Sequence, residues 1–210
     1  MTKITGTRSG TRAANDTARA GRVGAWFNAC PMPALANNFR VFTQDRLYMS
    51  VPRVEPEAIS ISQICYSANV ASGAGGVARF GIYTIINQAS PYNVQLGVAY
   101  ATLLLDAGTV ATDGAIGTKT ILFPDKVIPA GVWFAIVSVD QVAAPASRRY
   151  SQAGLYQISP WGAINPQDSV ALTTVSQGGV AGALPATFTP DTLELLPSNG
   201  DTGVQFLRSA

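Results

Sequence analysis

The acidic side chains are the residues of this 210-residue sequence that could carry out hydrolysis. A glycosidase needs two carboxyl groups flanking the sugar bond that it cleaves. Glu55 and Glu57 flank Pro56 ahead of an expected strand, and the other candidates are Asp106, Asp113, Asp125 and Asp168. The four aspartates stand in turn-like contexts, where Asp commonly hydrogen-bonds to nearby backbone. We therefore interpret these acids as structural, with a polysaccharide-degrading enzyme as the alternative.

Histidine is absent from the sequence. Its absence removes the commonest general base and the commonest metal ligand. The two cysteines, Cys30 and Cys65, are isolated, do not form a zinc motif and have no imidazole to activate them. We expect both to be small apolar residues of the interior, and a Cys30–Cys65 disulfide is the less favoured alternative. The sequence thus predicts no catalytic residue, no metal site and no cofactor.

A glycine-rich segment and an arginine pair are the remaining motifs with a chemical interpretation. Gly73-Ala74-Gly75-Gly76 lacks the Lys-Ser/Thr that follows a phosphate-binding loop, so we expect a hairpin loop there. Arg148, Arg149 and Tyr150 place two cations beside an aromatic ring, and Trp161 lies in another loop. These four residues are candidates for contact with a receptor glycan or a partner. The alternative is a solvated arginine pair with a loop aromatic that covers the core.

Short strands are the elements that must position these side chains. From about residue 46 onward, short apolar or alternating runs are separated by Gly, Pro, Asn and Asp, a pattern typical of consecutive antiparallel strands. No apolar stripe of helical period is longer than three turns, so helix content should be low. We therefore predict an all-β fold, an antiparallel jelly-roll-like β-sandwich with an extended N-terminal arm.

Val132–Val139 is the clearest strand of the sequence, because apolar residues occupy both of its faces. One face carries Val132, Phe134 and Ile136, and the other carries Trp133, Ala135, Val137 and Val139. A strand of this kind lies between two layers or at a subunit contact. We expect both faces to be covered, with Phe134 and Ile136 in the core.

Other segments give weaker signals. Thr118–Phe123 alternates, and we expect Pro124 to end that strand. Gln141–Tyr150 is interpreted as a loop and Val204–Leu207 as a closing strand. The role of residues 141–210 is left open.

The first 25 residues differ in composition from the rest, being rich in Thr, Ser, Gly, Ala and Arg without any period. Such a segment cannot bury enough apolar area to offset the entropy of ordering it. Lys3–Arg22 carries a net charge of +4, against −2 for the remainder. We interpret residues 1–40 as a flexible basic arm that attaches the protein to a particle, and residues 41–210 as the β-sandwich domain. The expected attachment residues are Arg8, Arg12, Arg19, Arg22, Trp26, Phe27 and Met32.

Two other interpretations of the arm are nucleic-acid binding and a tail without a function. We favour attachment over both, because aromatic and apolar residues follow the basic stretch so closely.

Overall composition indicates a protein that assembles with other subunits. Charged residues make up 12% of the chain, against roughly 25% in an average soluble domain. A surface so poor in charge is expected to face other subunits in part. The longest apolar stretches, such as Val98–Leu105, are far shorter than the ~20 residues of a membrane span, and no secretory signal pattern is present. We expect the chain to stay in the cell that makes it.

Four runs, in this order and spacing, resemble a module that recurs in proteins of tailed bacteriophages. They are Arg79–Tyr83 (RFGIY), Leu103–Val110 (LLLDAGTV), Gly117–Ile121 (GTKTI) and Pro129–Ala135 (PAGVWFA). In that family they belong to a jelly-roll-like sandwich of tail fibres and other virion appendages. The resemblance covers about residues 46–140 and implies no catalytic residue.

The resemblance implies a structural virion protein, a tail fibre or baseplate-associated appendage involved in host attachment. The expected assembly is a homotrimer. Its arm would contact other virion proteins, and the trimer would also contact a host surface glycan or protein. It would form in the host cytoplasm and reside in the virion, with no membrane span and no nucleic-acid partner. A head fibre or capsid decoration protein is the alternative.

Overall fold

The computed structural model describes residues 26–28, 36–41, 43–50, 52–68, 71–142, 147–152, 173–195 and 204–209. Every regular element in these ranges is a β-strand, and every ladder is antiparallel, which confirms the predicted all-β sandwich class. The strands are β1 (Trp26–Asn28), β2 (Ala36–Val41), β3 (Leu47–Met49), β4 (Ile59–Ala68), β5 (Val77–Ile85), β6 (Ala101–Ala111), β7 (Gly117–Ile128), β8 (Phe134–Gln141), β9 (Ser147–Gln152), β10 (Thr173–Gln177), β11 (Thr187–Phe188), β12 (Thr192–Leu195) and β13 (Val204–Ser209).

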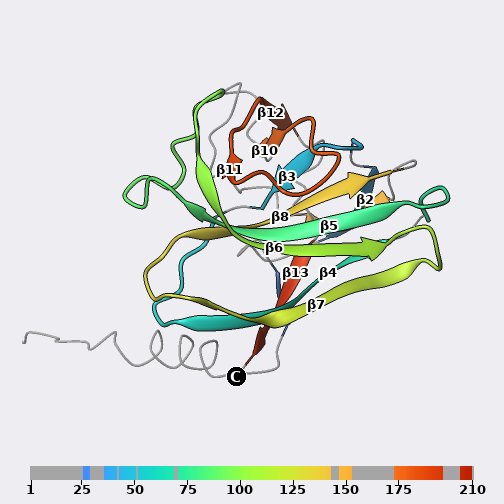
Figure 1. Ribbon diagram of the computed structural model, residues 1–210, viewed down its shortest axis with the longest axis horizontal. Helices are drawn as coiled ribbons and strands as arrows, with labels where there is room; N and C mark the ends of the chain where they lie inside the picture. Colours follow the sequence, from blue (N-terminus) through green and yellow to red (C-terminus); the bar gives the residue numbers. More distant parts are fainter. Residues whose placement is uncertain are drawn as a thin grey trace, which may run out of the picture.

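The strands form two sheets that lie on top of each other. One has the order β1-β13-β4-β9-β2, with β7 also paired to β4, and the other has the order β11-β6-β5-β8-β3-β10-β12. Figure 1 shows β4 and β7 beneath β5, β6 and β8, with β3, β10, β11 and β12 above them. The second sheet curls into a half-barrel, so its outer strands cover the face that is turned away from the first sheet.

A first hydrophobic cluster fills the space between the two sheets. Its buried members come from β4, β5, β7 and β8: Ile59, Ile61, Ile64, Ala68, Ala78, Phe80, Ile82, Ile121, Ile128, Phe134 and Ile136. Alternate residues of each strand point to this side because successive side chains of a strand face opposite ways. Val132 packs against the same cluster, as the alternation in the sequence predicts.

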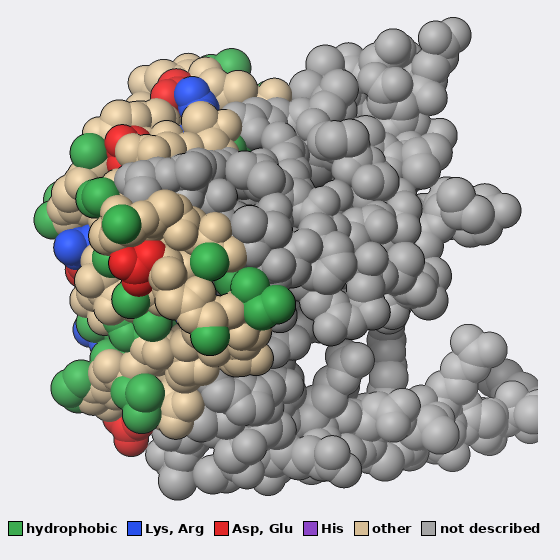
Figure 2. Space-filling model, turned by 90° about the vertical axis from the view of Figure 1, so that its right-hand side faces the viewer, with side chains coloured by type: hydrophobic (Ala, Val, Ile, Leu, Met, Phe, Trp, Pro, Cys, Tyr) green, Lys and Arg blue, Asp and Glu red, His purple; other side chains and the backbone are tan. Residues whose placement is uncertain are grey.

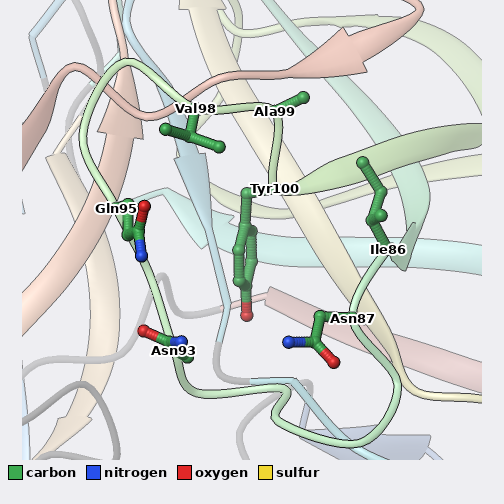
Figure 3. Close-up of a pocket in the computed structure, with 7 residues that line it drawn as sticks. All are labelled: Ile86, Asn87, Asn93, Gln95, Val98, Ala99 and Tyr100. Carbon is green, nitrogen blue, oxygen red and sulfur yellow. The ribbon is translucent and has the colours of Figure 1, made fainter.

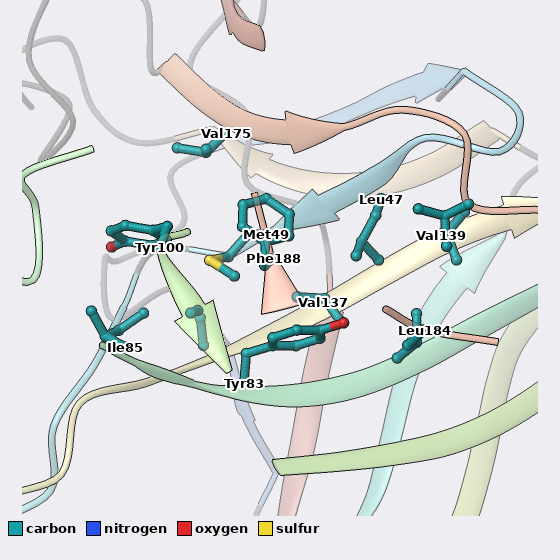
Figure 4. Close-up of a cluster of buried hydrophobic side chains, with 13 residues drawn as sticks. Leu47, Met49, Tyr83, Ile85, Tyr100, Val137, Val139, Val175, Leu184 and Phe188 are labelled. Atoms are coloured by element: carbon teal, nitrogen blue, oxygen red, sulfur yellow. The ribbon is translucent and has the colours of Figure 1, made fainter. Parts of the chain in front are cut away.

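A second hydrophobic cluster lies on the other face of the curled sheet (Figure 4). It contains Leu47, Met49, Tyr83, Ile85, Tyr100, Ala101, Ala135, Val137, Val139, Val175, Val180, Leu184 and Phe188, and Trp133 packs against it. All eight residues of β8 are buried as a result. The predicted burial of both faces of this strand is therefore confirmed, as are Phe134 and Ile136 as core residues.

Asp106 joins β6 to the segment around Leu184 and Phe188, which covers the second cluster and is called the cover below. A register shift between Phe80 and Gly81 places Asp106 at a β-bulge of β6. One carboxylate oxygen accepts a hydrogen bond from Gly108 N at 3.0 Å, the local backbone bond expected of an aspartate in such a position. The other oxygen pairs with Arg79 Nη1 at 2.6 Å and accepts a bond from Leu184 N at 3.1 Å.

Arg46 and Asp191 fasten the β10–β12 end of the sheet. Arg46 Nη1 lies 2.7 Å from Asp191 Oδ1 and also donates to Ser176 Oγ at 3.0 Å. Asp191 Oδ2 accepts a hydrogen bond from Gly178 N at 2.7 Å. Desolvation raises the pKa of Asp191, but these hydrogen bonds and the charge of Arg46 outweigh it and hold the pKa below its usual range.

The structure differs from the sequence prediction at four places. The first is the arm, because β1 pairs with β13 and β2 pairs with β9, so a boundary at residue 40 falls inside β2. Gln141–Tyr150 is not all loop, since β9 begins at Ser147. Pro124 does not end its strand, because β7 continues to Ile128 past an irregularity in its pairing with β4, which an edge strand tolerates.

The fourth difference is at Gly73–Gly76. This segment is a tight turn closed by a 3.0 Å bond from Gly76 N to Gly73 O. It joins β4 in one sheet to β5 in the other, so it is an inter-sheet connection and not a hairpin. The closing strand predicted at Val204–Leu207 is confirmed as β13, beside β4.

Replacing Ile136 by alanine should test the first cluster. Ile136 is 0% exposed, and we expect Ile136→Ala to lower the free energy of unfolding by ~2–5 kcal/mol through lost burial and a residual cavity. Ile116 is 65% exposed, so Ile116→Ala is a matched control, and we expect it to change the free energy of unfolding by less than ~0.5 kcal/mol. Urea denaturation of both variants measures this, and equal effects would show that β8 is placed wrongly.

Replacing Gly81 by alanine should test the contact between the sheet and its cover. A Cβ at this position would overlap Leu184 and lie 2.8 Å from the Leu105 carbonyl oxygen. We expect Gly81→Ala to destabilise the protein by ~1–3 kcal/mol, as overpacking does. Gly114→Ala is the control, because nothing lies within 4 Å of a Cβ there. Thermal unfolding that leaves both variants equal to the parent would contradict the packing of Leu184 on Gly81.

Candidate functional site

The loop between β5 and β6 carries the candidate binding site. It runs over 15 residues, from Ile86 to Tyr100. Connections of this length without secondary structure are uncommon in compact domains and are often functional. The loop forms a pocket of about 160 Å³ (Figure 3), lined by Ile86, Asn87, Asn93, Gln95, Val98, Ala99 and Tyr100.

Backbone bonds and one glutamine hold the loop in place. Trp133 N donates to Gln88 Oε1 at 2.7 Å, and Gln88 Nε2 donates to the Ile85 carbonyl, so this side chain joins the loop to the start of β8. Ile86 N bonds to Tyr100 O at 3.0 Å, which closes the base of the loop. Gly97 N bonds to Pro190 O at 2.8 Å and fastens the distal part to the segment beside β11. The pocket is therefore built on a fixed loop.

Tyr100 forms the inner wall of the pocket. Its side chain is only 5% exposed, and its ring packs edge-on against Phe188, with centroids 6.4 Å apart. Its hydroxyl donates a hydrogen bond to the Pro91 carbonyl within the same loop. Burial raises the pKa of Tyr100 well above its ordinary value, and Tyr92 adds to the effect. The ring thus offers a neutral surface, and its hydroxyl is engaged within the loop.

Three amide side chains supply the polar groups of the pocket. Figure 3 places Asn93 and Gln95 on one side of the Tyr100 ring and Asn87 on the other. Asn87 Oδ1 accepts a hydrogen bond from Ser90 N at 3.2 Å. The side chains of Asn93 and Gln95 make no hydrogen bond with the residues that the structure describes. Each of these two amides keeps both a donor and an acceptor for a ligand.

The exposed large side chains of the loop are apolar or uncharged. Ile86, Tyr92, Leu96 and Val98 are exposed large hydrophobic residues of this single loop. Tyr92 stands edge-on to Trp133, with ring centroids 5.5 Å apart. No charged residue occurs between Arg79 and Asp106 in the sequence. The loop therefore favours a ligand without net charge.

Of the acids singled out in the sequence, Glu55, Asp106 and Asp113 are held in structural contacts, whereas Glu57 and Asp125 are exposed. Glu55 pairs with Arg53, and Asp113 accepts a hydrogen bond from Gly75 N at 2.7 Å. Asp125 lies exposed on β7, and Asp168 lies outside the described residues. In the described ranges no three His, Cys, Asp or Glu side chains gather where they could hold a metal ion.

The side chain of Cys65 is buried, as expected of a small apolar residue. Desolvation by burial raises its pKa to about 11, so it stays protonated at neutral pH. Cys30 lies outside the described residues.

The residues predicted to contact a receptor or a particle are only partly placed. Arg148, Arg149 and Tyr150 lie on β9, opposite Arg40, Phe39 and Asn38 of β2. Trp26 and Phe27 lie on β1, opposite Leu207 and Phe206 of β13. The other predicted residues, Arg8, Arg12, Arg19, Arg22, Met32 and Trp161, lie outside the described part of the chain.

The end of the sandwich opposite this loop is also poor in charged side chains where the structure describes it. Figure 2 views the side of the molecule that is turned away from the loop at Ile86–Tyr100, and its described part shows scattered hydrophobic side chains with few charged ones. Within the described ranges, no helix is long and apolar enough to cross a membrane.

Neither the models of known protein families nor the curated protein sequences contain a match to this chain.

Reasoning from the sequence missed the pocket. None of the candidate site residues named from the sequence lies in the loop Ile86–Tyr100. The signal that could have revealed the site is the absence of charge from Phe80 to Leu105, combined with amides and apolar residues in a segment too long for a tight turn.

Replacing Gln88 by alanine should loosen the loop. The change removes the acceptor of the Trp133 N–H, so we expect a loss of ~1–2 kcal/mol in unfolding free energy and faster hydrogen exchange at that amide. Gln95→Ala in the same loop is the matched control, since its side chain makes no hydrogen bond with described residues. Amide exchange measured by NMR compares the two variants. An unchanged exchange rate of the Trp133 amide in Gln88→Ala would show that the Gln88 side chain does not hold the loop.

Proposed function

We propose that the chain is a non-enzymatic structural protein of a tailed bacteriophage particle, in a tail fibre or baseplate-associated appendage that contacts the host. The observation that carries the proposal is the uncharged pocket on a fixed loop at one end of a β-sandwich with two cores. A rigid scaffold with a binding loop at its end suits a protein that recognises a surface without changing it chemically.

The contacts of the acids support a role without catalysis. Asp106 holds Arg79 and the Leu184 backbone, Asp113 holds a turn, and Asp191 is paired with Arg46. A carboxylate engaged in this way is poorly suited to donate a proton or attack a sugar. Turnover of a host polysaccharide by the purified protein would revive the enzyme alternative.

Attachment to the particle is assigned to the N-terminal region. Arg8, Arg12, Arg19 and Arg22 would pair with carboxylates of another virion protein, while Met32 would add buried apolar area. Because Trp26 and Phe27 lie on β1, a test of this role should keep that strand and remove only residues 1–24. The basic part of the arm, with its four arginines, would then be removed without unpairing β1 from β13.

Immunoelectron microscopy should locate the protein on the virion. We expect antibodies against the purified chain to label the tail or baseplate of the phage that encodes it, and the variant that lacks residues 1–24 to be absent from particles. Label confined to the capsid would favour the head-fibre alternative. A chain found only free in the lysate would contradict a structural virion role.

Light scattering should show a homotrimer of the full chain at micromolar concentration. The reason is the low charge content, 12% of residues, which leaves apolar surface for contact with other subunits. A stable monomer at that concentration would contradict the proposed assembly.

A further inference from the structure

We infer that the pocket of the loop Ile86–Tyr100 binds one neutral sugar unit, through the amides of Asn93 and Gln95 and the apolar surface of Ile86, Val98 and the Tyr100 ring. The inference deepens the proposed function, because a role in host contact would make a glycan on the host surface the source of that sugar.

Charge decides the first property of the ligand. None of the lining residues is charged. Asp191 follows Pro190, which bonds to Gly97 of the loop, but its carboxylate is paired with Arg46. An anionic ligand such as a nucleotide or an acidic sugar would lose its hydration without gaining a cation. The pocket is therefore suited to a neutral molecule.

The hydrogen-bonding groups decide the second property. Asn93 and Gln95 each present a donor and an acceptor that no described residue uses, and the hydroxyl of Tyr100 is already bonded to Pro91 O. Sugar hydroxyls are also donors and acceptors at once, so they match amides that keep both groups. A purely apolar ligand would leave the two amides unpaired, at a cost in affinity.

Size and apolar surface decide the third property. The volume of about 160 Å³ is below the roughly 300–1,000 Å³ of sites for drug-sized ligands, which limits the occupant to a single small ring. Val98, Ile86 and the ring of Tyr100 offer apolar contact for the C–H groups of such a ring. Tyr92 is a further exposed aromatic side chain of the same loop.

The test is saturation-transfer NMR on the full chain with glucose, galactose, N-acetylglucosamine and, as an acidic comparison, glucuronic acid. We expect transfer to at least one neutral sugar and none to glucuronic acid. In Asn93→Ala/Gln95→Ala the affinity should fall at least ~10-fold, as expected for the loss of two hydrogen-bonding groups. Gln44→Ala, which alters an exposed amide outside the loop, should bind as the parent does.

Folding is controlled by a second variant, Asn93→Asp/Gln95→Glu, which keeps shape and introduces charge. It should melt as the parent does and bind neutral sugars more weakly. Transfer to none of the neutral sugars, transfer to glucuronic acid alone, or unchanged binding by both double variants would overturn the inference. None of these results bears on where the protein lies in the virion. If the chain binds sugar but is absent from particles, the proposed function is overturned and the sugar site is not.

Discussion

The burial of β8 on every side is the constraint on which the rest of the structure depends. All eight of its residues are buried, and its edges are paired with β5 and β3. A strand with two apolar faces requires a layer on each face. β4 and β7 supply one layer, while β3, β10 and the residues around Leu184 and Phe188 supply the other. Because the second sheet curls, a single chain provides both of the layers that cover β8.

Polar contacts keep the second layer in register with the sheet that it covers. Gln141 at the end of β8 donates to the carbonyls of Val180 and Gly182, and Tyr83 donates to that of Pro185. Asp106 adds a bond to the backbone of Leu184. These side chains reach across more than 35 residues of sequence and satisfy backbone groups that the cover would otherwise leave unpaired. The loop Ile86–Tyr100 is then held between this cover and β8, which explains how a segment without regular structure can form a pocket.

Local patterns in the sequence were enough to predict β8, its two faces and the core positions of Phe134 and Ile136. The two-residue period of a strand can be seen within the segment itself, without knowledge of its partners. They were not enough to predict β9 or the pairings β1–β13 and β2–β9, which join segments more than a hundred residues apart. The prediction that Pro124 ends its strand was wrong, because an edge strand tolerates a proline where a central strand does not. The pocket was missed since its groups are brought together by a loop whose path depends on Trp133 and Pro190.

A rigid double-cored sheet is what allows a small neutral pocket to be presented at the end of the molecule. The most direct test is native-state hydrogen exchange of the β8 amides, Phe134 to Gln141, across a series of low denaturant concentrations. If both faces are covered as described, these amides exchange only through global unfolding, with the free energy obtained from denaturant melting. Exchange through a local opening of clearly lower free energy would contradict the account, because it would mean that one face of the strand is not held closed.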